Sequence, residues 1–178
     1  STMADTVALC SGSHPPNPQG SGVATRSNYS PSFALTLANL QTAYTNMLKT
    51  RGDQGIPVYN KADLLCIPVD LWTTAFGLVN SEFDPFISGS NVRNPMYGKV
   101  QVPVLRYVGT DVSGPGGTDT SWWLVNTDRA KRFVHWYNSV PLEFQTSADF
   151  DAQVLKTASY AAWSLRPHYW DWIYGCTA

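Results

Sequence analysis

The sequence predicts an α+β domain in which two helices pack on a central sheet. Three observations support this fold class. Apolar residues recur at helical spacing in the first half of the chain, over residues 37–50 and 71–79. Near residue 98 the spacing changes to two, which is typical of β-strands. With 43% hydrophobic residues, the 178-residue chain can bury the core of one domain, or of one domain with a small second lobe.

The two helical segments differ in how widely their apolar residues are spread. Thr36 can cap the first helix, and apolar residues at helical spacing give it one apolar face. In the second segment Trp72, Ala75, Phe76 and Val79 share a face, and neighbouring leucines widen it. A helix that is apolar on most sides is expected to be buried on most sides.

The second half of the chain reads mainly as strands. Residues 99–107 alternate between apolar and polar, but Pro103 restricts this segment to an edge or bulged strand. A short turn at Asp128 and Arg129 is expected to join two of the strands. Further strands are expected over residues 5–10, 63–67, 122–126, 132–137 and 141–146.

One further segment is unusually long for a strand. No Gly or Pro interrupts residues 153–166, and β-branched and aromatic residues favour a strand over a helix. As one strand it would span about 46 Å, whereas a compact chain of this size has a radius of gyration of about 16 Å. The sequence therefore predicts an elongated molecule in which this strand couples two lobes.

Composition argues against several function classes. Charged residues make up only 14% of the chain, the formal net charge is −1, and no basic block is present, so tight or sequence-specific nucleic-acid binding is not expected. No apolar run approaches the ~20 residues of a membrane span. Low charge with 13% aromatic residues fits two alternatives: a rigid aromatic core, or a surface largely covered by neighbouring molecules.

No cofactor or metal site is expected from the cysteines. Cys10, Cys66 and Cys176 lie far apart and include no CxxC pair, so neither a metal site nor a disulfide is predicted. Cys66 lies in an apolar run and is expected to be a small core residue. Three free thiols fit a reducing compartment such as a bacterial cytoplasm.

The histidines and tryptophans also favour structural roles. His14 follows two serines but lacks the oriented partners of a hydrolase triad, and the GxSxG motif is absent, so no catalytic residue is assigned and the chain is not expected to be an enzyme. The tryptophans near the end, Trp163, Trp170 and Trp172, could stack on sugars or pack in the core. Exposed coplanar rings in a groove would favour sugar binding.

Seven motifs occur in the order and spacing of one known family. They lie at residues 8–15 (ALCSGSHP), 27–40 (SNY…LTLANL), 53–57 (DQGIP), 63–68 (DLLCIP), 94–99 (NPMYGK), 123–151 (WLV…FD) and 169–172 (YWDW). Together they resemble the major capsid proteins of tailed phages, of the Mu-like head-subunit kind. The resemblance covers about residues 5–174.

The resemblance implies a fold, a function and partners. The fold would be the tailed-phage capsid fold, shared with encapsulins and herpesvirus shells. Residues 1–152 would form the axial domain, and residues 153–178 would return as a strand of the peripheral domain. The chain would be a structural subunit of an icosahedral capsid that assembles in the host cytoplasm and encloses double-stranded DNA. Its partners would be copies of itself in hexamers and pentamers, with scaffold, portal or decoration proteins as further candidates.

The resemblance also assigns a role to two loops. Residues 80–97 and 109–120 are long, polar and marked by Gly and Pro, and such loops carry contacts. The residues expected at subunit interfaces are Arg93, Asn94, Asp111 and Asp119. The family's N-terminal arm, extended loop and spine helix would precede residue 5, so we expect the chain alone to be a monomer or a weak oligomer. The alternative function is a carbohydrate- or ligand-binding β-rich phage module.

Overall fold

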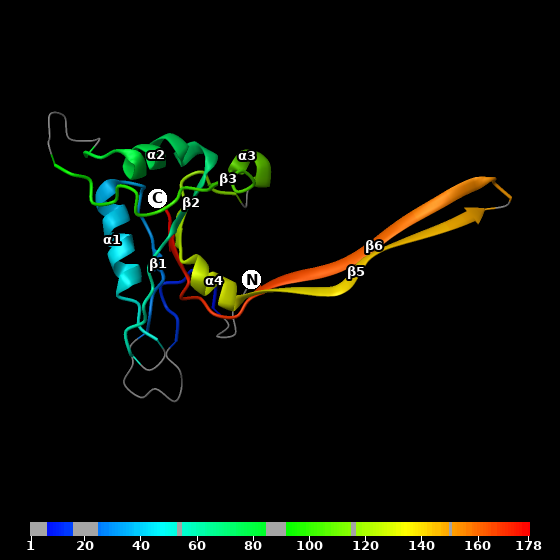
Figure 1. Ribbon diagram of the computed structural model, residues 1–178, viewed down its shortest axis with the longest axis horizontal. Helices are drawn as coiled ribbons and strands as arrows, with labels where there is room; N and C mark the ends of the chain where they lie inside the picture. The colour runs from blue at the N-terminus through cyan, green and yellow to red at the C-terminus, as the bar shows by residue number, and fades with distance from the viewer. Residues whose placement is uncertain (1–6, 16–24, 53–54, 85–91, 115–116, 150) are drawn as a thin grey trace.

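Five short strands form the central sheet, in the order β1-β7-β4-β2-β3 (Figure 1). β4 is antiparallel to both of its neighbours, β2 and β7, whereas β1 and β3 join the edges in parallel. The computed structural model describes residues 7–15, 25–52, 55–84, 92–114, 117–149 and 151–178. The strands span Tyr29–Ser30 (β1), Leu64–Pro68 (β2), Val104–Leu105 (β3), Trp122–Val125 (β4) and Ile173–Cys176 (β7).

Register places one face of this sheet against the core. Leu65 pairs with Leu124, which pairs with Tyr174, and paired residues share a face. All three side chains are buried, as are Trp122 and Cys176 on the same face. The indole N–H of Trp122 donates to the carbonyl of Phe33 at 2.8 Å, which satisfies the ring's polar atom inside the core.

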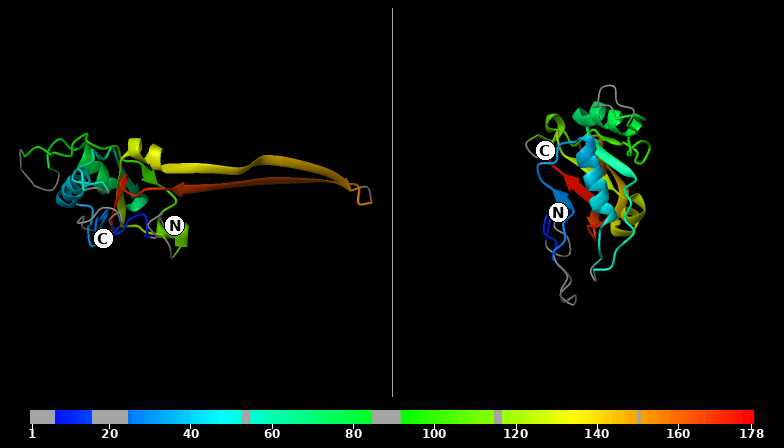
Figure 2. Two further views of the ribbon diagram at one scale, coloured as in Figure 1. Left: turned by 90° about the horizontal axis from the view of Figure 1, so that it is seen from below. Right: turned by 90° about the vertical axis from the view of Figure 1, so that its left-hand side faces the viewer.

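Two helices cover that face. Helix α1 (Leu37–Leu48) contributes buried Leu40, Ala43 and Met47. Thr36 caps α1, accepting from the amide of Asn39 at 3.3 Å, as its sequence predicts. Helix α2 (Trp72–Asn80) follows the 3-10 turn η1 (Val69–Leu71) and contributes Ala75, Leu78 and Val79. Figure 2 shows α1 lying across the sheet, and a mixed α+β fold with both helices on a sheet is confirmed.

A long two-stranded hairpin extends away from this domain. β5 (Val134–Asp149) and β6 (Val154–Pro167) pair antiparallel along their length, with two register shifts in β5 between Asn138 and Glu143. Figures 1 and 2 show the hairpin as an arm that projects from one side of the domain. The turn joining the two strands contains residue 152, where the expected division between the axial domain and the returning strand lies.

The hairpin provides the partner of the long strand. Residues 154–167 do form one strand, as predicted, and that strand pairs with β5 in the projecting arm. The strands expected at 132–137 and 141–146 merge into β5. The chain then turns back into the domain as β7, a strand that periodicity does not reveal because it is only four residues long.

Three further predictions are wrong in detail. The turn at Asp128 and Arg129 is instead helix α4 (Thr127–Phe133), capped by the Asn126 side chain, which accepts from the Arg129 amide at 3.2 Å. Trp72 and Phe76 of α2 are 52% exposed and point away from the core. Cys66 pairs with Trp123 on the other face of the sheet and is only half-buried.

The predicted loops and edge strand have mixed outcomes. Pro103 lies beside β3, which is short and at the sheet edge, as expected. Within the loop 109–120, residues Thr110–Ser113 form the one-turn helix α3. The strand expected over residues 5–10 falls partly outside the described residues, and Val7 to Cys10 are not in a strand.

Candidate functional site

The β5–β6 hairpin has one apolar and one polar face. Trp136 pairs with Leu165, Phe144 pairs with Ser159, and Ala148 pairs with Leu155. Because side chains alternate along a strand, Trp163 lies on the same face as Leu165. We define the apolar face by five side chains, which are 58–70% exposed. They are Trp136, Phe144, Leu155, Trp163 and Leu165.

All charged side chains in the two strands lie on the opposite face. Glu143 pairs with Tyr160 and Asp149 with Val154, while Lys156 and Arg166 alternate with apolar-face residues of β6. Lys156 donates to the Asp149 carboxylate at 2.7 Å, and this bond holds the pKa of Asp149 below its usual range. The polar face suits water, whereas the apolar face does not.

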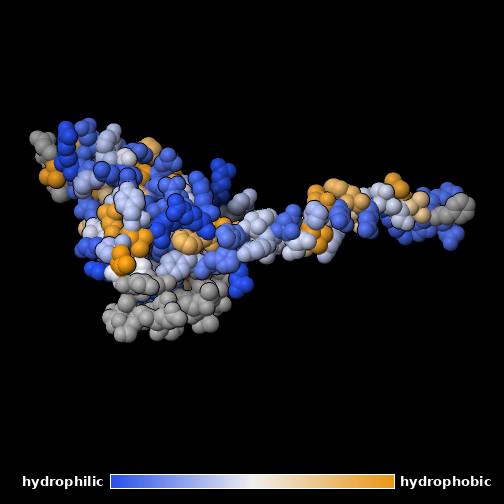
Figure 3. Space-filling view, turned by 60° about the horizontal axis from the view of Figure 1, so that its bottom comes forward, coloured by the Kyte–Doolittle hydropathy of each residue, from blue (hydrophilic) through white to orange (hydrophobic). Residues whose placement is uncertain are grey.

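Two tryptophans form the most prominent part of the apolar face. The rings of Trp136 and Trp163 stack at 4.6 Å with an interplanar angle of 15°. They are 59% and 62% exposed, so most of their surface is available for contact. Figure 3 shows hydrophobic side chains gathered along the arm. Of the two alternatives for the tryptophans near the end of the chain, core packing holds for Trp170, which is buried, and not for Trp163, which is exposed.

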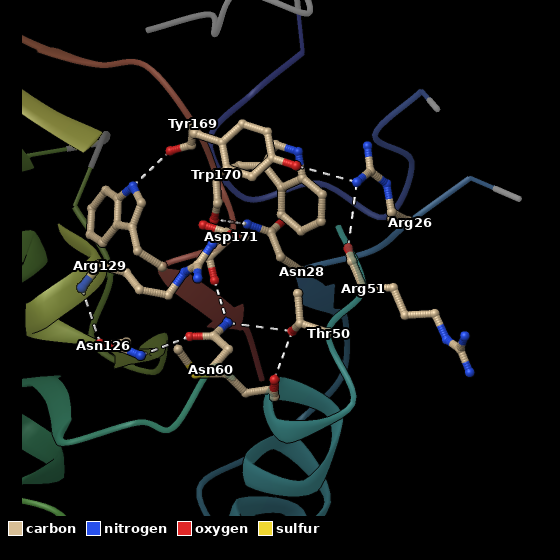
Figure 4. Close-up of polar contacts among 12 residues, drawn as sticks. Arg26, Asn28, Thr50, Arg51, Asn60, Asn126, Arg129, Tyr169, Trp170 and Asp171 are labelled. Carbon is tan, nitrogen blue, oxygen red and sulfur yellow. Dashed lines mark hydrogen bonds and ion pairs between the residues drawn. The ribbon is translucent and has the colours of Figure 1, made fainter. Parts of the chain in front are cut away.

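A buried polar network fixes the base of the hairpin (Figure 4). The chain enters β5 through α4 and leaves β6 through residues 168–172. Arg129 of α4 forms an ion pair with Asp171, whose side chain is only 1% exposed. Two backbone hydrogen bonds join these segments. The backbone N–H of Asn126 donates to the Trp172 carbonyl at 2.8 Å, and the backbone N–H of His168 donates to the Phe133 carbonyl at 2.8 Å. Entry and exit segments are therefore held to each other.

Asn60 ties this base to the domain. Its side chain is fully buried, donates to the Asp171 carbonyl, and accepts from the Asn126 side chain at 3.0 Å. Asp63, three residues further, accepts from the Thr127 amide at 2.8 Å and from its hydroxyl. Sequence reasoning missed this network, although Asn126 ahead of Thr127-Asp128 has the composition of a helix cap.

The N-terminal segment packs against the same region. His14 is fully buried, stacks on Trp170 at 4.3 Å, and contacts the Asn28 side-chain oxygen through Nε2 at 3.0 Å. The Asn28 NH₂ group donates to three carbonyls, so its oxygen accepts and His14 Nε2 carries the proton. Arg26 covers Trp170, with its guanidinium carbon 5.1 Å from the ring centre. His14 therefore has a packing role, in line with the structural role that the sequence favours for it.

The four residues expected at subunit interfaces lie in different settings. Arg93 is exposed and 3.9 Å from the Glu82 carboxylate, and Asp111 is exposed on α3. Asn94 is buried, and its side chain bonds to the Ser81 carbonyl at 3.0 Å and to the Met96 amide at 2.9 Å. Asp119 accepts from the amide and hydroxyl of Thr110, which lowers its pKa. Arg93 and Asp111 thus have side chains available for contact, whereas Asn94 and Asp119 hold their own loops.

Among the described residues, no cluster of three or more His, Cys, Asp or Glu is arranged to hold a metal ion. None of the described helices has the length and apolarity needed to span a membrane.

The comparisons with known proteins agree with the resemblance in the sequence. No curated protein is similar enough to the chain to count as a match. A family model described as phage capsid protein matches residues 4–176, which include the sheet, both core helices and the whole hairpin. Because this match covers nearly the entire chain, the protein belongs to the phage capsid protein family and is a structural component of the virion capsid.

Proposed function

We propose that this chain is part of a subunit that self-assembles into an icosahedral capsid and encloses the double-stranded DNA of a tailed phage. Family membership supports the structural role. We further propose the fold shared with encapsulins and herpesvirus shells, the Mu-like kind of head subunit, and assembly in the bacterial cytoplasm as hexamers and pentamers. Residues 1–152 and 153–178 would be the axial domain and the returning strand of the peripheral domain.

The exposed apolar face of the hairpin is the observation that best supports assembly. An isolated two-stranded hairpin is marginally stable in water. Each large apolar side chain contributes about 1.5–3 kcal/mol when it is fully buried. Five such side chains on an uncharged face therefore favour a state in which another capsid segment covers them.

The apolar face suits shell contacts better than sugar binding. Trp136 and Trp163 stack on each other within the β5–β6 hairpin, which projects from the domain (Figure 1). A sugar platform would instead present coplanar rings in a groove. The alternative of a carbohydrate- or ligand-binding phage module is therefore the weaker proposal.

The two faces of the hairpin provide a matched test. Trp163 and Tyr160 are 62% and 60% exposed and lie on opposite faces of β6. In the capsid protein as the phage makes it, Trp163→Gln is expected to lower particle yield strongly, and Tyr160→Gln to leave it near wild type. Particle yield is measured by gradient sedimentation and electron microscopy. Equal yields from both variants would contradict an assembly role for the apolar face, and loss of glycan binding in Trp163→Gln would favour the alternative.

The predicted interface loops allow a second test of assembly. Charge reversal at the exposed side chains, Arg93→Glu or Asp111→Lys, is expected to impair particle formation without unfolding the subunit. Circular dichroism of the purified variants checks the fold. Normal particle yield from both variants would show that these loops are not contacts.

A further inference from the structure

A pocket beside the hairpin base gathers much of the chain's positive charge. Its volume is about 530 Å³, and Tyr59, which is 81% exposed, is one of the residues that line it. Four of the chain's 12 Lys and Arg residues line it, although the whole chain has a net charge of −1. These are Lys61, Lys99, Arg129 and Arg132. We call these residues and Tyr59 the basic pocket.

Of the four cations in the basic pocket, only Arg129 forms an ion pair within the described part of the chain. Arg129 is paired with Asp171. Two carboxylates, Asp63 and Asp128, also line the pocket, and the Asp63 carboxylate is bonded to Thr127. Among the described residues, no carboxylate forms an ion pair with Lys61, Lys99 or Arg132. Within the described lining, three cations without an ion pair therefore face two carboxylates, which leaves a small excess of positive charge for a partner from outside.

The other end of the domain has the opposite charge balance. Along the chain segments that form η1, α2 and α3 and the loops next to them, the sequence has five carboxylates and two cations, Arg93 and Arg106. Figure 1 places α2 and α3 at one end of the domain and α4, with the hairpin base, toward the other. The carboxylates, which we call the acidic end, belong to Asp70, Glu82, Asp84, Asp111 and Asp119.

Within the acidic end, Asp70 and Asp111 are best placed for contact. Both are exposed, and neither is tied to an internal cation in the described part of the chain. Glu82 lies 3.9 Å from Arg93, and Asp119 is bonded to Thr110.

We propose that the basic pocket of one subunit binds the acidic end of a second copy of this chain. The proposal rests on the proposed function, in which copies pack side by side. Complementary charge on two different surfaces produces a head-to-tail contact, and such contacts form a ring when the rotation from one copy to the next closes. Each exposed charge pair is weak, so the contact becomes strong only when several form together in an assembly.

The contact is tested first with the 178-residue chain itself. Sedimentation equilibrium is run from about 0.01 M to about 1 M ionic strength, over which the Debye length falls from ~30 Å to ~3 Å. Weak self-association is expected at low salt, with an association constant that falls on the order of tenfold or more as salt rises. Absence of association at low salt, or association insensitive to salt, would overturn the proposal.

Charge reversal identifies the two surfaces. Lys61→Glu with Arg132→Glu, and Asp70→Lys with Asp111→Lys, should each abolish low-salt association. A mixture of the two variants should regain it, and a misfolded variant could not produce that rescue. Lys49→Glu with Arg166→Glu changes net charge as much as the first pair but lies outside the pocket, and should associate as wild type. Reversed variants that still associate, or a mixture that does not, would contradict the assignment.

Particle assembly separates this inference from the proposed function. If the wild-type capsid protein forms shells and the reversed variants form them equally well, the proposed function holds and the charge contact is wrong. If the wild-type protein forms no shells, the proposed function itself fails. Shells from wild type but from neither reversed variant, together with restored association of the mixture in solution, would support both.

Discussion

At the residue scale, one glycine controls how the N-terminal segment meets the sheet. Gly175 of β7 lies on the face opposite the core, and a Cβ placed there would be 2.9 Å from both Cβ and Sγ of Cys10. Such a contact is too close for any side chain to be accommodated without movement. The absence of a side chain at Gly175 is therefore what lets Cys10 pack on the strand.

Gly175→Ala is expected to lower the free energy of unfolding by about 1–3 kcal/mol, because it overpacks this contact. Urea denaturation measures the change. In the background of Cys10→Gly, which removes both clashing atoms, the same substitution should cost much less. Gly77→Ala is the control: it lies within α2 with nothing inside 4 Å of the new Cβ, and should stabilise by about 0.5–1 kcal/mol. Equal effects at both glycines would contradict the packing argument.

The buried thiols are expected to make the stability of the folded protein depend on pH in the alkaline range. Burial raises the pKa of Cys10 and of Cys176 to about 12, and that of Cys66 to about 11, from an ordinary value of 9.0. Above pH 9.0 the unfolded thiols lose protons while the folded ones keep them, so stability should fall as pH rises from there. Thermal melts across this range measure the fall, and Cys176→Ala should reduce it. A pH-independent melting temperature would contradict the assignment.

The same thiols test the prediction of no disulfide. Native protein should react slowly with a thiol reagent, because little thiolate forms near neutral pH. After denaturation without reductant, three thiols should react. Fewer than three would show that a disulfide is present.

At the element scale, the hairpin depends on its base. The ion pair of Arg129 and Asp171 is largely buried, and removing one partner leaves an unpaired charge behind. Asp171→Asn is therefore expected to lower the free energy of unfolding by about 3–5 kcal/mol. The control Asp149→Asn breaks an exposed pair with Lys156 near the hairpin tip and should change stability little. Similar losses from both variants would argue against a buried anchor.

Long helices and strands could be predicted from the sequence, whereas short strands and the pairing between strands could not. The helix capped by Thr36 and the strand at residues 154–167 have patterns long enough to be recognised locally. β7 has only four residues, too few for a strand period to be recognised. The period within β6 also does not tell which strand β6 pairs with, or in which register. Trp72 and Phe76 were misplaced because an all-apolar helix pattern cannot tell a buried side from one that faces solvent.

The candidate site was less predictable than the fold. Asn60, Asn126, Arg129 and Asp171 come from three separate segments, since Asn126 caps the helix that contains Arg129, and only the folded chain brings them together. Arg93 and Asp111 were predicted as exposed loop residues, and the structure places both side chains at the surface. Their subunit contacts stay a prediction. The apolar face was missed because β5 contains two register shifts, which interrupt simple alternation.

At the scale of the whole molecule, the arm determines the shape in solution. A compact chain of this size would have a radius of gyration of about 16 Å. Because the hairpin projects from the domain (Figure 2), small-angle X-ray scattering should give a clearly larger value and an asymmetric distance distribution. Light scattering on the same sample should report a monomer or a weak oligomer at micromolar concentration. A compact monomer would mean that the hairpin folds back onto the domain.

The length of the arm also makes it a lever. Its 14-residue strand β6 spans about 46 Å. A rotation of about 10° where the arm meets the domain would move the tip by about 8 Å, more than the ~4.8 Å between neighbouring strands. Small adjustments among Asn60, Arg129 and Asp171 are thus multiplied at the far end. Subunits of identical sequence could in this way contact neighbours in parts of a shell that differ in curvature. Only the angle between arm and domain would change, and the domain itself would stay rigid.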